Sequence, residues 1–165
     1  MSNSDTAPAV IITRTFEAPI DTVWSMFAEA EHFGAWYGPQ GAELEVQRFE
    51  PEPGGDRLVC MRMPTPQGTH EMWFTGEFVE LDPPTRLVYT ESVCDATGRV
   101  LTATEMGMPE GAPTTTRVVV DLTSVGSEAD GSTQLTLTHE GIPAGSPGEM
   151  GWQMALDKLA ARLTP

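Results

Sequence analysis

The sequence predicts one α+β domain, in which a curved antiparallel sheet of about seven strands wraps on a long C-terminal helix and two short helices follow the first strand. Three observations carry this prediction. Helical spacing directly follows the first β-branched segment, strand-like segments separated by short turns fill residues 43–139, and the last apolar stripe has the period of a helix. With 165 residues, of which 39% are hydrophobic, the chain is long enough to form one packed core.

The N-terminal part should contain a strand and two short helices. Residues 1–8 are polar and are expected to form a flexible arm, so that the single domain spans 9–165. The β-branched run over 9–16 predicts a strand. Apolar residues at helical spacing predict a helix over 20–30, and a second short helix is expected over 31–36. The spaced apolar residues of the first helix are Ile20, Val23, Trp24 and Phe27.

The middle of the chain alternates between strand-like segments and turn sequences. The candidate strands are 43–49, 57–63, 69–81, 86–94, 115–124 and 133–139. Most are separated by short stretches rich in Gly, Pro and Asp, such as Pro53-Gly54-Gly55-Asp56. Connections this short cannot carry parallel crossovers, so an antiparallel meander is predicted. The segment 99–114 is longer and is expected to form an irregular flap.

The C-terminal segment has clear start signals for a helix. Ser146 is a favourable N-cap, Pro147 suits the first helical position, and Glu149 completes an S-x-x-E capping box. One apolar stripe follows, made of Trp152, Leu156, Leu159 and Leu163. Because the sheet must bury one face, this stripe is expected to cover it.

Six segments, in the same order as these elements, carry a resemblance to a known family. They are RTFEAPIDTVW (14–24), AWYGP (35–39), PGGD (53–56), GEFVELDPPTRLV (76–88), LTLTHEG (135–141) and GWQMALDKL (151–159). Together they resemble the SRPBCC (START-like) superfamily, and within it the family of the C-terminal domain of the activator of heat-shock-protein-90 ATPase. The resemblance implies a helix-grip fold with a cavity between helix and sheet. Superfamily members bind lipids, sterols, polyketides or hormones, cyclise polyketides, or act as co-chaperones, so the fold does not set the function.

Composition restricts the partners and the compartment. Nine Lys plus Arg against 24 Asp plus Glu give a net charge of −15, which would repel nucleic acid and anionic membranes and favours solubility or a basic protein partner. Cys60 and Cys94 are too few for a disulfide scaffold. The first residues lack the features of a signal peptide, and no apolar run is long enough for a membrane helix. A cytoplasmic protein is therefore expected.

Strand alternation predicts which side chains face the cavity. Inner faces are expected to be apolar and rich in methionine, which adapts to varied apolar shapes. Glu91 and His139 fall on these inner faces. One interpretation is that both lie near strand ends and bond to solvent or backbone. The other is that they orient a polar head group of a ligand or act as acid and base. The candidate ligand-binding residues are Trp36, Met61, Met63, Met72, Phe74, Phe78, Tyr89, Glu91, Val120, Leu137, His139, Trp152 and Leu156.

The sequence lacks the common motifs of cofactor and metal chemistry. It contains no phosphate-binding loop, no G-x-G-x-x-G after a strand and no G-x-S-x-G elbow. The cysteines and histidines also lack the close spacing of a zinc site. No cofactor, metal or assigned catalytic residue is therefore expected.

Three functional hypotheses remain open at the level of sequence. The first is binding of an apolar or amphipathic small molecule between the sheet and the C-terminal helix. The second is a co-chaperone or stress-related protein-interaction module. The third is an enzyme similar to a polyketide cyclase or dehydratase that uses Glu91 and His139. A homodimer is also expected, because two-fold dimers are the commonest soluble assemblies.

Overall fold

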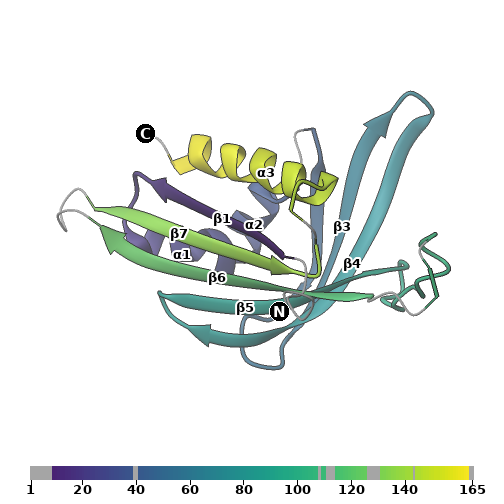
Figure 1. Ribbon diagram of the computed structural model, residues 1–165, viewed down its shortest axis with the longest axis horizontal. Coiled ribbons are helices and arrows are strands. Elements are labelled where there is room, and N and C mark those ends of the chain that lie inside the picture. Colours follow the sequence, from purple (N-terminus) through teal and green to yellow (C-terminus); the bar gives the residue numbers. More distant parts are fainter. Residues whose placement is uncertain are drawn as a thin grey trace, which may run out of the picture.

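The computed structural model describes residues 9–38, 41–107, 109–110, 114–125, 131–142 and 144–163. The arm expected over residues 1–8 lies outside these ranges. The described residues form one antiparallel sheet of seven strands together with three helices. Figure 1 shows the longest helix, α3, lying over one face of the sheet. The predicted α+β, helix-grip architecture is confirmed.

The element boundaries agree closely with the sequence-based prediction. In chain order the elements are β1 (Ala9–Phe16), α1 (Ile20–Ala28), α2 (Ala30–Trp36), β2 (Glu43–Phe49), β3 (Asp56–Thr65), β4 (Gly68–Asp82), β5 (Arg86–Cys94), β6 (Thr115–Val125), β7 (Ser132–Glu140) and α3 (Pro147–Leu163). Strand β3 extends to Thr65, two residues beyond its predicted end. The first helix is predicted to reach residue 30 but is two residues shorter. It ends at Ala28 because Glu29 is extended, with φ −119° and ψ 129°, and separates α1 from α2.

The strands are arranged in the order β1-β7-β6-β5-β4-β3-β2. Every neighbouring pair is antiparallel, and β1 forms one edge of the sheet by pairing with β7. Register shifts between Val46 and Arg48 and between Phe78 and Glu80 interrupt two of the ladders, and such bulges bend a sheet. The long β3–β4 hairpin rises beside the N-terminal end of α3 in Figure 1.

The core lies between the sheet and the three helices. Its sheet side comes from alternate residues, including Val118, Val120 and Leu122 of β6, all of which are buried. The apolar stripe of α3 packs against this face through Trp152, Leu156 and Leu159. Helices α1 and α2 add an aromatic cluster around Trp36, whose Nε1 donates a 2.9 Å hydrogen bond to the carbonyl of Met26.

The start of α3 differs from the predicted capping box. The Ser146 hydroxyl is buried and has no hydrogen-bond partner among the described residues. The Glu149 carboxylate instead accepts a 2.7 Å hydrogen bond from the backbone N–H of Gly145, one residue before the expected donor. The glutamate therefore still satisfies an amide beside the helix N-terminus, where a negative charge is favourable.

Gly76 occupies a position in β4 that does not tolerate a side chain. It pairs with Arg57 of β3, and a Cβ atom at Gly76 would overlap the backbone carbonyl oxygen of Thr90. By contrast, a Cβ atom at Gly151 in α3 would meet open space. The two glycines therefore form a matched pair for testing the packing of β4 against β5.

We expect Gly76→Ala to lower the free energy of unfolding by about 1–3 kcal/mol or more, because the added methyl group forces the strands apart. Gly151→Ala should raise it by about 0.5–1 kcal/mol, since alanine favours the helix. Urea denaturation of both variants measures the difference. Equal stability of the two variants would contradict the close approach of Gly76 to Thr90.

Candidate functional site

A cavity of about 440 Å³ lies between α3, the β3–β4 hairpin and the turn that follows β7. Most of its lining is apolar. The lining residues are Tyr37, Gly38, Met61, Met63, Met72, Phe74, Glu91, His139, Ile142, Gly148, Gly151, Trp152 and Ala155. Its volume falls within the range of pockets that hold small molecules, which are mostly apolar with a few placed polar groups.

A second chamber of about 220 Å³ adjoins the first. The two share Phe74, Glu91, His139 and Ile142 as lining residues. The second chamber continues past these residues to Met106, in the turn region after β5. Glu91 and His139 therefore border both chambers of the cavity.

His139 joins the sheet to α3 through its imidazole ring. The indole Nε1–H of Trp152 donates to His139 Nδ1 at 2.9 Å, so the other ring nitrogen carries the proton of the neutral imidazole. That nitrogen, Nε2, lies 2.7 Å from the hydroxyl oxygen of Thr116 and donates to it. Burial lowers the pKa of His139 to about 4, so the ring is neutral at pH 7 with both nitrogens occupied.

Glu91 accepts a hydrogen bond from a buried tyrosine. The hydroxyl of Tyr37 donates to Glu91 Oε2 at 2.9 Å, and the hydroxyl of Tyr89 lies 2.9 Å from that of Tyr37. Burial raises the pKa of Glu91, while the positive charge of Arg57 and the Tyr37 hydrogen bond act to lower it. Burial also raises the pKa values of both tyrosines, so they remain protonated donors.

The structure separates the predicted site residues into two groups. Seven of them line the cavity: Met61, Met63, Met72, Phe74, Glu91, His139 and Trp152. The other six, which do not line it, pack in the core or in the apolar stripe behind it: Trp36, Phe78, Tyr89, Val120, Leu137 and Leu156. Sequence reasoning did not single out Tyr37, which follows α2, or Ile142, which follows β7. Neither belongs to a periodic segment, so no pattern identified them.

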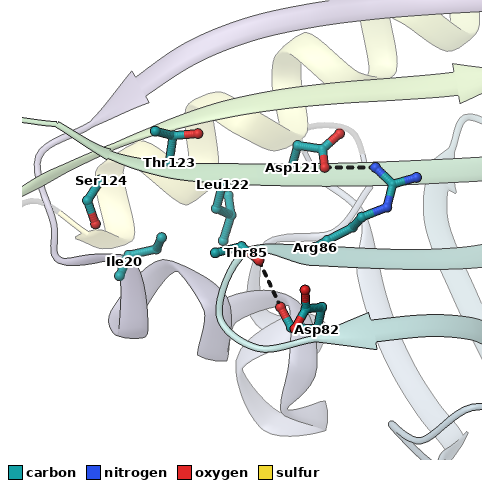
Figure 2. A pocket seen from close by; sticks show the side chains of 8 residues that line it. All are labelled: Ile20, Asp82, Thr85, Arg86, Asp121, Leu122, Thr123 and Ser124. Carbon is teal, nitrogen blue, oxygen red and sulfur yellow. Dashed lines mark hydrogen bonds and ion pairs between the residues drawn. The ribbon is translucent and has the colours of Figure 1, made fainter.

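A separate surface depression of about 460 Å³ lies near the β4–β5 turn. Figure 2 shows Arg86 bonded to Asp121, at 2.8 Å, and the hydroxyl of Thr85 donating to the backbone of Asp82. Arg86 also forms an ion pair with Glu80 at 3.2 Å. Because these carboxylates already neutralise the guanidinium, Arg86 offers no unpaired positive charge to a ligand in this depression.

Metal-ligand clusters and membrane-spanning helices are both absent from the described residues. No group of three or more His, Cys, Asp or Glu side chains within the described ranges is arranged to hold a metal ion. No helix in the same ranges is both long and apolar enough to cross a membrane.

The family of the chain follows from comparison with protein-family models. Residues 17–164 match the family described as "Activator of Hsp90 ATPase homolog 1-like protein". The chain belongs to this family. The match begins at the end of β1 and includes every element that lines the cavity. A search of the curated proteins found no match.

Solved structures share the fold across nearly the whole chain. A crystal structure of a protein from Chromobacterium violaceum is 25% identical, with a TM-score of 0.73, and the match covers 95% of this chain and 97% of that one. A solution structure from Staphylococcus epidermidis is 23% identical, with a TM-score of 0.73 and coverage of 99% and 93%. An AHSA1 protein from Silicibacter pomeroyi is 18% identical, with a TM-score of 0.69 and coverage of 94% and 96%. These similarities support the fold of this chain and do not identify a ligand for it.

The buried imidazole predicts a specific loss of stability in acid. An unfolded histidine has a pKa near 6.5, and the folded His139 has a pKa of about 4, so the unfolded chain binds more protons between these values. The contribution of this group to the free energy of unfolding is fully present above about pH 6.5. It is lost, by ~3 kcal/mol, as the pH falls to about 4. The raised pKa of Glu91 acts in the opposite direction, so a variant must isolate the histidine.

We expect His139→Gln to show a shallower decline of stability between pH 6.5 and pH 4 than the unchanged protein, because glutamine offers an acceptor and a donor but does not titrate. His70→Gln, at an exposed position of β4, is the matched control and should retain the full decline. Denaturation curves across this pH range make the measurement. Parallel curves for all three proteins would contradict the buried, neutral state of His139.

Proposed function

We propose that the chain binds an apolar or amphipathic small molecule in the cavity between the sheet and α3. The observation that carries the proposal is the lining of this cavity, in which methionine, phenylalanine and tryptophan side chains surround only a few polar groups. Burial of apolar ligand surface would drive association at about 25 cal/mol per Å² before ordering costs. The methionines suit ligands of varied shape.

The hydrogen bonds of His139 favour binding over acid–base catalysis. A general base needs a free lone pair that reaches the substrate proton, but His139 Nδ1 already accepts from Trp152. Its other nitrogen is bonded to Thr116, and no hydrogen bond joins His139 to Glu91 within the described part of the chain. A cyclase or dehydratase that uses Glu91 and His139 as a pair therefore has less support than a binding protein.

A protein-interaction role has weaker support from the surface. The large apolar side chains that are exposed among the described residues are Ile11, Val79, Val100 and Met150. Ile11 of β1 and Val79 of β4 are separated by three strands of the sheet, whereas docking surfaces usually gather apolar residues in one patch. A cytoplasmic location is part of the proposal, because Cys60 and Cys94 are both buried free thiols.

Native mass spectrometry of the protein purified without denaturation, followed by organic extraction, tests the proposal. We expect a stoichiometric adduct of apolar character on the unchanged protein. Met72→Glu should abolish the adduct, because it places a charge in the cavity lining.

Met150→Glu is the matched control for this experiment. Met150 is 65% exposed and does not line the cavity, so this variant should keep the adduct. Circular dichroism checks that both variants remain folded. Retention of the adduct by folded Met72→Glu would contradict binding at this site.

A further inference from the structure

Arg57 is a charged residue enclosed in the interior of the sheet. Its exposed fraction is 1%, and its guanidinium lies 3.9 Å from the ring centroid of Tyr89. Its nearest backbone partner is the carbonyl of Thr90, at 3.4 Å from Nη1, and its Nε and Nη2 atoms have no hydrogen-bond partner among the described residues. Because arginine keeps its charge in proteins, a nearby negative charge is needed to offset it.

Two tyrosine hydroxyls connect the surroundings of Arg57 to Glu91. Tyr37 has one hydroxyl proton and donates it to Glu91 Oε2, so Tyr89 must donate to Tyr37. Both donors thus point along one chain that ends on the carboxylate, which is the arrangement that an ionised carboxylate favours. Glu91 and the cationic Arg57 also attract each other electrostatically.

The strand register keeps Arg57 and Glu91 close to the same level of the sheet. Arg57 of β3 pairs with Gly76 of β4. On its other side, Gly76 lies between the paired positions Thr75–Ser92 and Phe78–Tyr89. A side chain at Gly76 would overlap the Thr90 carbonyl, which is the acceptor of the Arg57 hydrogen bond. The glycine therefore allows the close approach of the Thr90 carbonyl that accepts from Arg57.

The remaining polar groups of the lining do not add charge. His139 is neutral with both nitrogens bonded, and Tyr37 is protonated. Among the described lining residues of both chambers, Glu91 is the one formally charged side chain. With Arg57 behind it, this end of the cavity carries one negative and one positive charge and is neutral overall.

We propose that the ligand carries an uncharged hydrogen-bond donor, such as an alcohol or phenol hydroxyl, that binds Glu91, and that Arg57 sets this specificity by offsetting the charge of Glu91. The inference rests on the proposed binding function. A ligand ammonium group would leave an excess positive charge beside Arg57, and a ligand carboxylate would lie against Glu91. A neutral donor satisfies the carboxylate without either cost.

Four naphthalene probes with the same apolar body test the inference. They are 2-naphthol, 2-naphthoic acid, 2-naphthylmethylamine and 2-methylnaphthalene, and their dissociation constants are measured at pH 7. We expect 2-naphthol to bind at least about tenfold more tightly than the other three, because a hydrogen bond to a charged group contributes about 1.5–3 kcal/mol.

Two variants change the charge balance in opposite directions. Arg57→Met leaves Glu91 without its compensating charge, so the binding of 2-naphthylmethylamine should gain at least about tenfold relative to 2-naphthol. Glu91→Gln leaves Arg57 uncompensated, so 2-naphthoic acid should gain by a similar factor. Arg117→Met and Glu77→Gln remove the same charges at exposed strand positions and should leave the order unchanged.

The outcomes separate this inference from the proposed function. Similar affinities for all four probes, or a preference of the unchanged protein for 2-naphthoic acid, would overturn the inference and leave cavity binding intact. Failure of every probe to bind would overturn both. Thermal unfolding checks each variant. If Arg57→Met does not fold, the probe order of the unchanged protein and the response of Glu91→Gln still decide the inference.

Discussion

The enclosed guanidinium of Arg57 constrains much of the structure around it. Its charge lies against the faces of Tyr89, Phe33 and Phe78, and no carboxylate of the described residues forms a direct ion pair with it. Aromatic faces attract a cation but do not neutralise it. The tyrosine chain to Glu91 supplies an anion nearby. The absence of a side chain at Gly76 lets the Thr90 carbonyl approach β4, and this carbonyl accepts a hydrogen bond from Arg57.

The position of α3 gives the cavity its shape. The Trp152–His139 hydrogen bond fixes the helix over the sheet, while glycines 148 and 151 leave room on the side of the helix that borders the cavity. The same bond occupies the lone pair that His139 would need as a base. One contact therefore both holds the fold together and directs the site towards binding. Glu91 and Arg57 then determine the charge at this end of the cavity.

Local sequence patterns predicted the fold and about half of the cavity lining. Alternation in β3 and β4 assigned Met61, Met63, Met72 and Phe74 to the inner face, and all four line the cavity, because the two-residue period of a strand is set by its own backbone. The same alternation could not distinguish Tyr89, in the core, from Glu91 on the cavity wall, since that difference depends on the position of α3. Arg57 alternates in phase with Val59 and Met61, which predicts an inward side chain. The groups that stabilise its buried charge, Tyr89 and Glu91, come from another strand, so alternation within β3 could not reveal them.

The most direct test of the central claim is a crystal structure of the protein with 2-naphthol bound. The proposal predicts the ring system between α3 and β4, in contact with Met72 and Trp152, and the hydroxyl within hydrogen-bond distance of Glu91. A probe bound in the depression beside Arg86, or bound in the cavity with its hydroxyl directed away from Glu91, would contradict it.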